Sequence, residues 1–180
     1  MIIESIFPPH LYSIRYDSEE INEFDRLLDN WNDAVYVTEF LRANSDYLST
    51  PVWSQTPTPE DAARQVYNEA RVIEEYFEEL AQNSYQGIIP NFNSIFHYLD
   101  GKYKYELKIP PMKSYGHVRP SLIRIYAIKL GDNCYLITGG GIKLSDTIQN
   151  SPDLKDHVLQ NIDKVRNYLL ENGISDSLDI

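Results

Sequence analysis

The chain has 180 residues, a formal net charge of −11 at pH 7 and a pI near 4.7, and its length fits one domain spanning residues 1–180. Its acidity argues against indiscriminate binding to nucleic acid, because general affinity for phosphate needs a positive surface. The chain has no apolar run long enough to cross a bilayer, no signal-peptide pattern and a single cysteine, Cys134, so we expect a cytoplasmic protein without membrane contacts or an intramolecular disulfide.

The chain begins with residues that are typical of β-strands. Ile2–Ile6 and Leu11–Tyr16 are rich in β-branched and aromatic residues, and Pro8-Pro9 between them cannot continue a sheet ladder. We therefore predict two short strands, or one strand with an extended lead-in.

Two helices are predicted next, and the short connection between them makes a helical hairpin. Asp17 and Ser18 offer N-caps for the first helix, and Asn32 or Asp33 can cap the second, which runs to about Asn44. Helical spacing predicts the buried faces, which are Ile21, Phe24, Leu27, Leu28 and Trp31 in the first helix and Val35, Tyr36, Phe40 and Leu41 in the second.

A loop over 45–57 is expected to separate this hairpin from a long helix. Thr58-Pro59-Glu60-Asp61 supplies an N-cap, a proline in the first turn and carboxylates near the positive end of the helix dipole. The predicted buried face consists of Val66, Ile73, Phe77 and Leu80. We expect Glu69, Glu74, Glu75, Glu78 and Glu79 to lie mostly on the solvated remainder of the helix and to bind no metal.

The second half of the chain is predicted to form a small sheet. Phe92, Phe96 and Tyr98 are expected to pack a short turn or loop onto the core, and 102–108 alternates lysine and tyrosine as a half-exposed strand that Pro110-Pro111 ends. Two further strands, Ile125–Leu130 and Cys134–Thr138, flank a hairpin turn at 131–133.

An amphipathic helix over Pro152–Leu170, with Gly173 after it, is expected to close the chain. The predicted fold class is therefore α+β, with a small antiparallel sheet packed against an N-terminal helical hairpin, a long middle helix and a C-terminal helix. We expect the helices to cover one face of the sheet and to leave a lysine-bearing face open.

Charge is segregated along the chain. Lys and Arg number 5 against 18 Asp and Glu in residues 1–100, 8 against 2 in 101–145, and 3 against 7 in the remainder. We call residues 101–145 the basic segment. Such segregation indicates that the basic segment faces an anionic partner, either RNA or the acidic part of the protein itself.

The basic segment supplies the candidate site residues. Cationic groups for phosphate are Lys113, Arg119, Arg124, Lys129 and Lys143, and tyrosines that can stack on bases are Tyr103, Tyr105, Tyr115, Tyr126 and Tyr135. Strand alternation places Arg124 and Tyr126 on one face and Lys129 on the other, so Arg124 with Tyr126 is the better pair. The alternative for Arg124 is an ion pair with an acidic residue of a covering helix.

Two further features of the basic segment bear on chemistry. His117 is its only histidine, and an imidazole can move a proton during cleavage of an RNA backbone. Gly139-Gly140-Gly141 follows a strand, but the residues after it are predicted to be extended rather than helical, so we favour a bulge or bend over a phosphate cradle.

Motifs for nucleotide cofactors, zinc and calcium are absent from the sequence, and no cofactor is expected.

The segment LIRIYAIKLGDNCYLITGGGIKLSDTIQ, at 122–149, resembles the RelE/ParE-type toxin superfamily near its HigB branch or a related phage branch. The order of elements and FDRLLDNWND at 24–33 extend the resemblance loosely to about half of the chain. In that family a helical hairpin packs on a small antiparallel sheet, and a strand of the pattern Arg-hydrophobic-Tyr leads into a glycine and lysine stretch. Here these positions are Arg124, Tyr126, Gly139 to Gly141 and Lys143.

The resemblance implies a toxin that cleaves mRNA, usually on the ribosome, without a metal and under the control of an antitoxin protein. Arg124 and Lys143 would bind the scissile phosphate, His117 or Tyr126 would assist proton transfer, and Lys113, Arg119 and Lys129 would contact RNA. The chain is longer and more acidic than compact members and ends without a Tyr or His in the expected catalytic place. A noncatalytic module whose acidic helices bind a basic partner is therefore the alternative.

Overall fold

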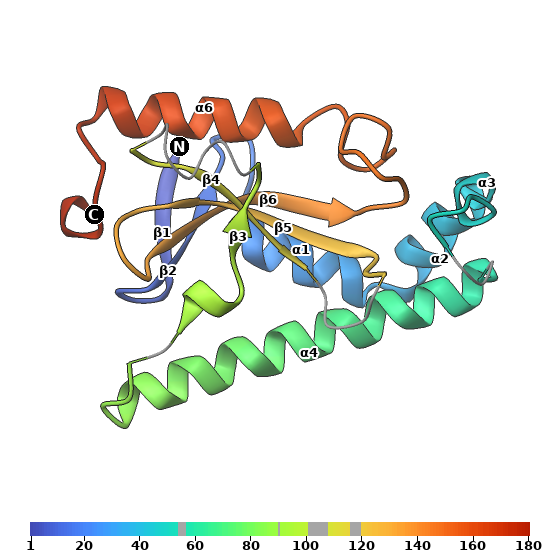
Figure 1. The fold of residues 1–180 in the computed structure, drawn as a ribbon, viewed down its shortest axis with the longest axis horizontal. Helices are drawn as coiled ribbons and strands as arrows, with labels where there is room; N and C mark the ends of the chain where they lie inside the picture. Colours follow the sequence, from blue (N-terminus) through green and yellow to red (C-terminus); the bar gives the residue numbers. More distant parts are fainter. Residues whose placement is uncertain (54–56, 90, 101–107, 116–119) are drawn as a thin grey trace.

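The structure is a computed structural model that describes residues 1–53, 57–89, 91–100, 108–115 and 120–180. Its centre is a six-stranded sheet of strand order β1-β2-β6-β5-β4-β3. Figure 1 shows α1 and the long α4 on one side of this sheet and α6 on the other. The α+β class is confirmed, whereas the expected open face is wrong, because α6 packs against β5 and β6 on that face.

The first two strands form a hairpin, as predicted. β1 (Ile2–Phe7) pairs antiparallel with β2 (Leu11–Arg15), and the Pro8-Pro9 peptide bond in the connection is cis. β2 then pairs parallel with β6, so the sheet is mixed rather than antiparallel. A parallel pair requires a long crossover, and here the chain makes it through the helices and the other strands between β2 and β6.

The helical hairpin is also present, with α1 at Glu23–Asn32 and α2 at Ala34–Ala43. Asp33 joins the helices and caps α2 by accepting hydrogen bonds from the amides of Val35 and Tyr36. The predicted start of the first helix is wrong. Asn22, rather than Asp17 or Ser18, caps α1, because the Asn22 side chain accepts from two amides of the first turn.

The buried face of α2 differs from the prediction. Leu41 is buried as predicted and Val37 is buried as well, whereas Val35 is 65% exposed and Tyr36 is 36% exposed. Val37 and Leu41 are four residues apart and therefore share the face that packs into the main core with α1 and α4. The apolar residues of the first turn lie on the outer side of the helix.

A short helix, α3 (Ser45–Leu48), occupies the start of the predicted loop, and α4 spans Pro59–Tyr85. The Thr58 hydroxyl caps α4 by accepting from the amide of Asp61 at 3.1 Å, as the sequence predicts. All four residues of its predicted buried face are buried. The exception to the predicted pattern is Glu69, which is fully buried rather than solvated.

The rest of the sheet comes from the second half of the chain. A 3-10 turn, η1 (Phe92–Ser94), leads into β3 (His97–Tyr98), and β4 (Pro111–Tyr115), β5 (Ile123–Lys129) and β6 (Tyr135–Ile142) form an antiparallel meander. The β5–β6 hairpin is confirmed. β4 was not predicted, because Pro110-Pro111 was expected to end a strand, whereas Pro111 occupies the first strand position, which proline tolerates. Most of the predicted strand at 102–108 lies outside the described residues.

The glycine triplet lies inside β6 and pairs with β5 in regular register. A bulge lies one residue before the predicted position, because Thr138 is the extra residue between the pairs Tyr126–Gly139 and Ala127–Ile137. Gly140 packs against α1, where an added Cβ would lie 2.8 Å from the side chain of Leu27. Cys134 is buried, as expected.

α6 spans Val158–Glu171 and confirms the closing helix, although it starts later than the predicted Pro152. Its buried residues belong to two smaller apolar clusters. Val165 and Leu169 pack with residues of β2, β5 and β6, and Val158 and Ile162 pack with Tyr126 and Leu154. Gly173 follows the helix with φ of +71°, and a 3-10 turn, η2 (Ser177–Asp179), lies near the end of the chain. Within the described residues, no helix is long and apolar enough to span a membrane.

Candidate functional site

A cleft of about 460 Å³ opens on the α6 side of the sheet, and residues of β4, β5 and the segment after β6 line it. Register determines which strand residues face it. Lys113 lies opposite Tyr126, and Tyr115 lies opposite Arg124. Side chains of directly opposed residues share one face of a sheet, so these four side chains point to the same side. With Lys143 they form what we call the cationic cleft.

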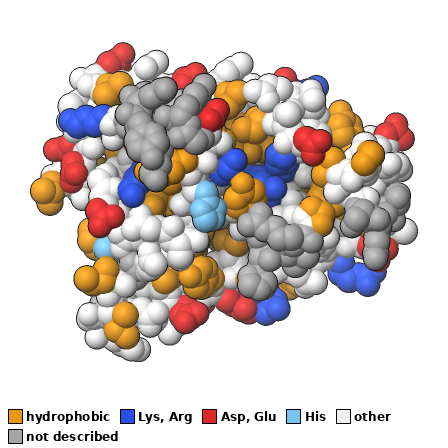
Figure 2. All heavy atoms as spheres, in the orientation of Figure 1, with side chains coloured by type: hydrophobic (Ala, Val, Ile, Leu, Met, Phe, Trp, Pro, Cys, Tyr) orange, Lys and Arg blue, Asp and Glu red, His pale blue; other side chains and the backbone are white. Residues whose placement is uncertain are grey.

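The cationic cleft carries net positive charge. Its lining includes the cations Lys113, Arg124 and Lys143 and the carboxylates Asp100 and Asp146. Figure 2 shows Lys and Arg side chains gathered near the middle of one face of the molecule, next to a histidine. This gathering is the local positive surface that an acidic protein needs in order to bind an anion.

Arg124 is held firmly against β4. Its guanidinium lies over the ring of Tyr115, with 4.4 Å between Cζ and the ring centroid. Nη1 also donates to the carbonyl oxygens of Ser121 and Ile123, at 3.0 and 2.7 Å. Cation–π stacking and these hydrogen bonds orient the guanidinium before any ligand arrives.

Lys143 follows β6 and is half-buried, and its Nζ donates to the carbonyl oxygens of Ser145 and Asp146. Burial, assisted by the positive charge of Arg124, lowers the pKa of Lys143 to about 8. The ammonium group therefore begins to lose its proton close to physiological pH. A bound anion would reverse this effect, because it favours the charged form.

Lys113 and Tyr126 complete the cationic cleft. Lys113 Nζ donates to the carbonyl oxygen of Leu99 at 3.1 Å and lies 5.8 Å from the centroid of the Tyr115 ring. Tyr126 is only 1% exposed, and burial raises the pKa of its hydroxyl above 10. Tyr126 therefore keeps its proton at neutral pH, where it can donate a hydrogen bond but cannot act as a base.

Glu69, on α4, supports the segment that precedes Arg124. Its carboxylate accepts hydrogen bonds from the Ser121 hydroxyl at 2.7 Å and from the amides of Leu122 and Ile123 at 3.1 and 3.2 Å. Burial raises the pKa of this carboxyl. Position 69 lies at helical spacing between Val66 and Ile73, so the periodicity alone indicated a buried residue. An acidic residue at that position was nevertheless expected to be solvated.

Replacing Glu69 by alanine is expected to destabilise the fold by about 2–4 kcal/mol, because buried donors at Ser121, Leu122 and Ile123 lose their acceptor. Chemical denaturation measures the change. Glu78→Ala, on the exposed face of the same helix, is the control and should change the free energy of unfolding by less than about 0.5 kcal/mol. Equal effects of the two substitutions would contradict the assigned role of Glu69.

The structure brings together Lys113, Arg124, Tyr126 and Lys143 but not every predicted site residue. Lys129 lies outside the cationic cleft, with its Nζ 3.2 Å from Asn93 Oδ1, because strand alternation turns it to the opposite face. His117 and Arg119 lie outside the described residues, as do the tyrosines at 103 and 105.

The described residues contain no group of three or more His, Cys, Asp or Glu side chains placed to hold a metal ion. No family model, curated protein or solved structure matches the chain.

Proposed function

We propose that this protein is the toxin of a toxin–antitoxin or phage-defence pair and cleaves mRNA, without a metal cofactor, in the cationic cleft. The observation that carries the proposal is the convergence of Lys113, Arg124 and Lys143, from three separate stretches of chain, on one cleft that also holds Tyr126. Convergent cations with an oriented arginine suit the phosphate of a nucleic acid. The helical hairpin and the Arg124-bearing strand are elements that the RelE-type resemblance implies, and they support the same proposal.

The positive charges of the cationic cleft indicate which steps of RNA cleavage its residues would assist. In RNA cleavage, the 2′-oxygen forms a bond to the adjacent phosphorus while the bond from phosphorus to the 5′-oxygen breaks. Arg124 and Lys143 would bind the phosphate oxygens and stabilise the negative charge that builds up on them. The proton leaves the 2′-hydroxyl and one is returned to the 5′-oxygen. The imidazole of His117 would accept the proton of the 2′-hydroxyl and, once protonated, would supply the proton to the 5′-oxygen, while Tyr126 would donate a hydrogen bond.

The proposed partners are mRNA, free or on the ribosome, and a cognate antitoxin protein. A direct test is binding of wild-type protein to a short single-stranded RNA and to ribosomes over a range of salt concentrations. Three phosphate contacts predict that the logarithm of the affinity for single-stranded RNA falls with the logarithm of salt concentration with a slope of about −2. Absence of binding to both, together with tight binding to a protein partner, would favour the noncatalytic acidic module.

The titration of Lys143 predicts how RNA affinity depends on pH. Below pH 8 the free protein carries the charged ammonium that the phosphate needs, and above it the charge must be restored on binding. Affinity for a short RNA is therefore expected to fall by up to about tenfold per pH unit above 8, until the pKa of the complex is reached. Lys143→Arg, whose guanidinium stays charged, should move this loss to higher pH. Equal pH profiles for the two proteins would contradict the role of Lys143.

A further inference from the structure

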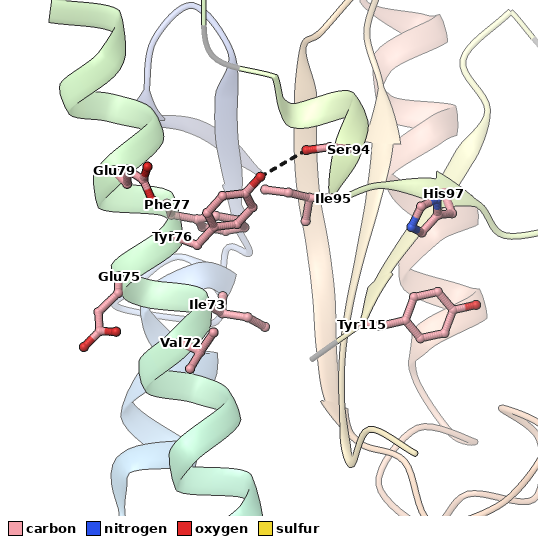
Figure 3. A pocket seen from close by; sticks show the side chains of 10 residues that line it. All are labelled: Val72, Ile73, Glu75, Tyr76, Phe77, Glu79, Ser94, Ile95, His97 and Tyr115. Carbon is pink, nitrogen blue, oxygen red and sulfur yellow. Dashed lines mark hydrogen bonds between the residues drawn. The ribbon is translucent and has the colours of Figure 1, made fainter. Parts of the chain in front are cut away.

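A second cavity, of about 610 Å³, adjoins the cationic cleft. Figure 3 shows it between α4, which contributes Ile73 and Tyr76, and the neighbouring strands β3 and β4, which carry His97 and Tyr115. Tyr115 lines both cavities and therefore forms the wall between them. The rings of His97 and Tyr115 lie 5.9 Å apart, and Arg124 stacks on Tyr115.

The lining of the second cavity differs from that of the cationic cleft. It is largely aromatic and aliphatic, with Tyr76, Phe77, His97, Tyr115, Ile73 and Ile95 among its residues. The Tyr76 hydroxyl is hydrogen-bonded to Ser94 at 3.2 Å, which links α4 to η1 beside the cavity. Tyr76 is 40% exposed, so part of its ring is accessible to a ligand.

Charge separates the two cavities further. Glu75 and Glu79 line the second cavity. Arg71 offsets the charge of Glu75, so the Glu79 carboxylate is the group that repels an anion, whereas Lys113, Arg124 and Lys143 attract one in the adjoining cationic cleft. A ligand that spans both cavities must therefore have an anionic end and an uncharged end. An uncharged flat ring would gain most from the aromatic walls. A nucleotide has this composition.

We propose that the second cavity is a nucleobase subsite, which stacks one base of a single-stranded RNA while the neighbouring phosphate lies in the cationic cleft. The subsite rests on the proposed function, because it assumes that the cationic cleft binds RNA phosphate. It adds a contact to the base itself. Stacking on Tyr76 and His97 makes no use of hydrogen-bonding edges, so the subsite accepts different bases.

Two oligomers of equal charge test the subsite, a single-stranded RNA trimer and a trimer of the same backbone without bases. Wild-type protein is expected to bind the base-containing trimer about tenfold or more tightly, as measured by calorimetry at fixed salt. Tyr76→Ala/His97→Ala should remove most of this preference while leaving affinity for the abasic trimer unchanged. Tyr67→Ala, an exposed tyrosine on the same helix, is the matched control and should keep the preference.

The outcomes separate the two proposals. Equal wild-type affinity for the two trimers, or a preference that survives Tyr76→Ala/His97→Ala, would overturn the subsite while leaving the phosphate site in place. Failure of the wild-type protein to bind either trimer would overturn the proposed function, and the subsite with it. Circular dichroism of the variants establishes that a lost preference does not arise from unfolding.

Discussion

Arg124→Ala/Lys143→Ala is expected to weaken binding to a short single-stranded RNA by about 100-fold to 10,000-fold. Each residue supplies a charge-assisted hydrogen bond to phosphate, and such bonds contribute about 1.5–3 kcal/mol each. Both side chains lie at the surface of the cationic cleft rather than in the apolar core, so the variant should remain folded. The slope of affinity against salt should also become shallower, because fewer counterions are released.

A control matched in residue types is Arg71→Ala/Lys129→Ala. Arg71 lies on the exposed side of α4, where it pairs with Glu75, and Lys129 lies on the opposite face of the sheet from Arg124. This control removes the same net charge without changing the cationic cleft, and its RNA affinity should fall by less than about tenfold. Similar losses in both double variants would show that overall charge, rather than the cationic cleft, controls binding.

Gly140→Ala is expected to destabilise the fold strongly, although it adds only one methyl group. A Cβ at this position would lie 2.3 Å from the carbonyl oxygen of Arg124 and 2.8 Å from the side chain of Leu27. The first contact is with backbone in a paired strand, which cannot move without disturbing the sheet. Overpacking of this kind costs about 3 kcal/mol. The melting temperature should therefore fall by about 6–12 °C, as measured by calorimetry.

Gly87→Ala is the control that measures the cost of backbone strain without steric conflict. Gly87 has φ of +78°, which favours glycine, but nothing lies within 4 Å of an added Cβ. This change should cost only about 1 kcal/mol, the strain of alanine in a left-handed conformation. A Gly140→Ala protein as stable as the Gly87→Ala protein would show that β6 can separate from β5 and α1 more easily than the structure indicates.

Local signals in the sequence were sufficient for several elements. The long amphipathic pattern and the Thr58 cap predicted α4, and Asp33 predicted the junction between α1 and α2. The turn at 131–133 predicted the β5–β6 hairpin. These signals were readable because the residues that produce each structure lie close together in the chain.

Features that depend on distant contacts were not predicted correctly. The parallel pairing of β2 with β6 joins residues more than a hundred positions apart, and no local pattern encodes it. The sequence predicts a solvated Glu69, whereas in the fold its carboxylate accepts hydrogen bonds from the amides of Leu122 and Ile123. β4 begins at a proline, which usually indicates the end of a strand.

Part of the candidate site followed from alternation along β5, which predicted that Arg124 and Tyr126 share a face and that Lys129 does not. The approach of Lys113 and Lys143 to this pair required the register of β4 and the path of the chain after β6. The second cavity had no signal in the sequence, because α4 and β3 meet there only in the folded chain.

Growth and mRNA integrity after induced expression provide the most direct test of the cationic cleft as an RNA-cleaving site. Wild-type protein is expected to arrest growth and to fragment mRNA, whereas soluble Arg124→Ala/Lys143→Ala should do neither. The gene next to this one would then be the first antitoxin candidate. Normal growth with intact mRNA in cells containing soluble wild-type protein would contradict the proposed function, and undiminished toxicity of the folded double variant would contradict the assigned site.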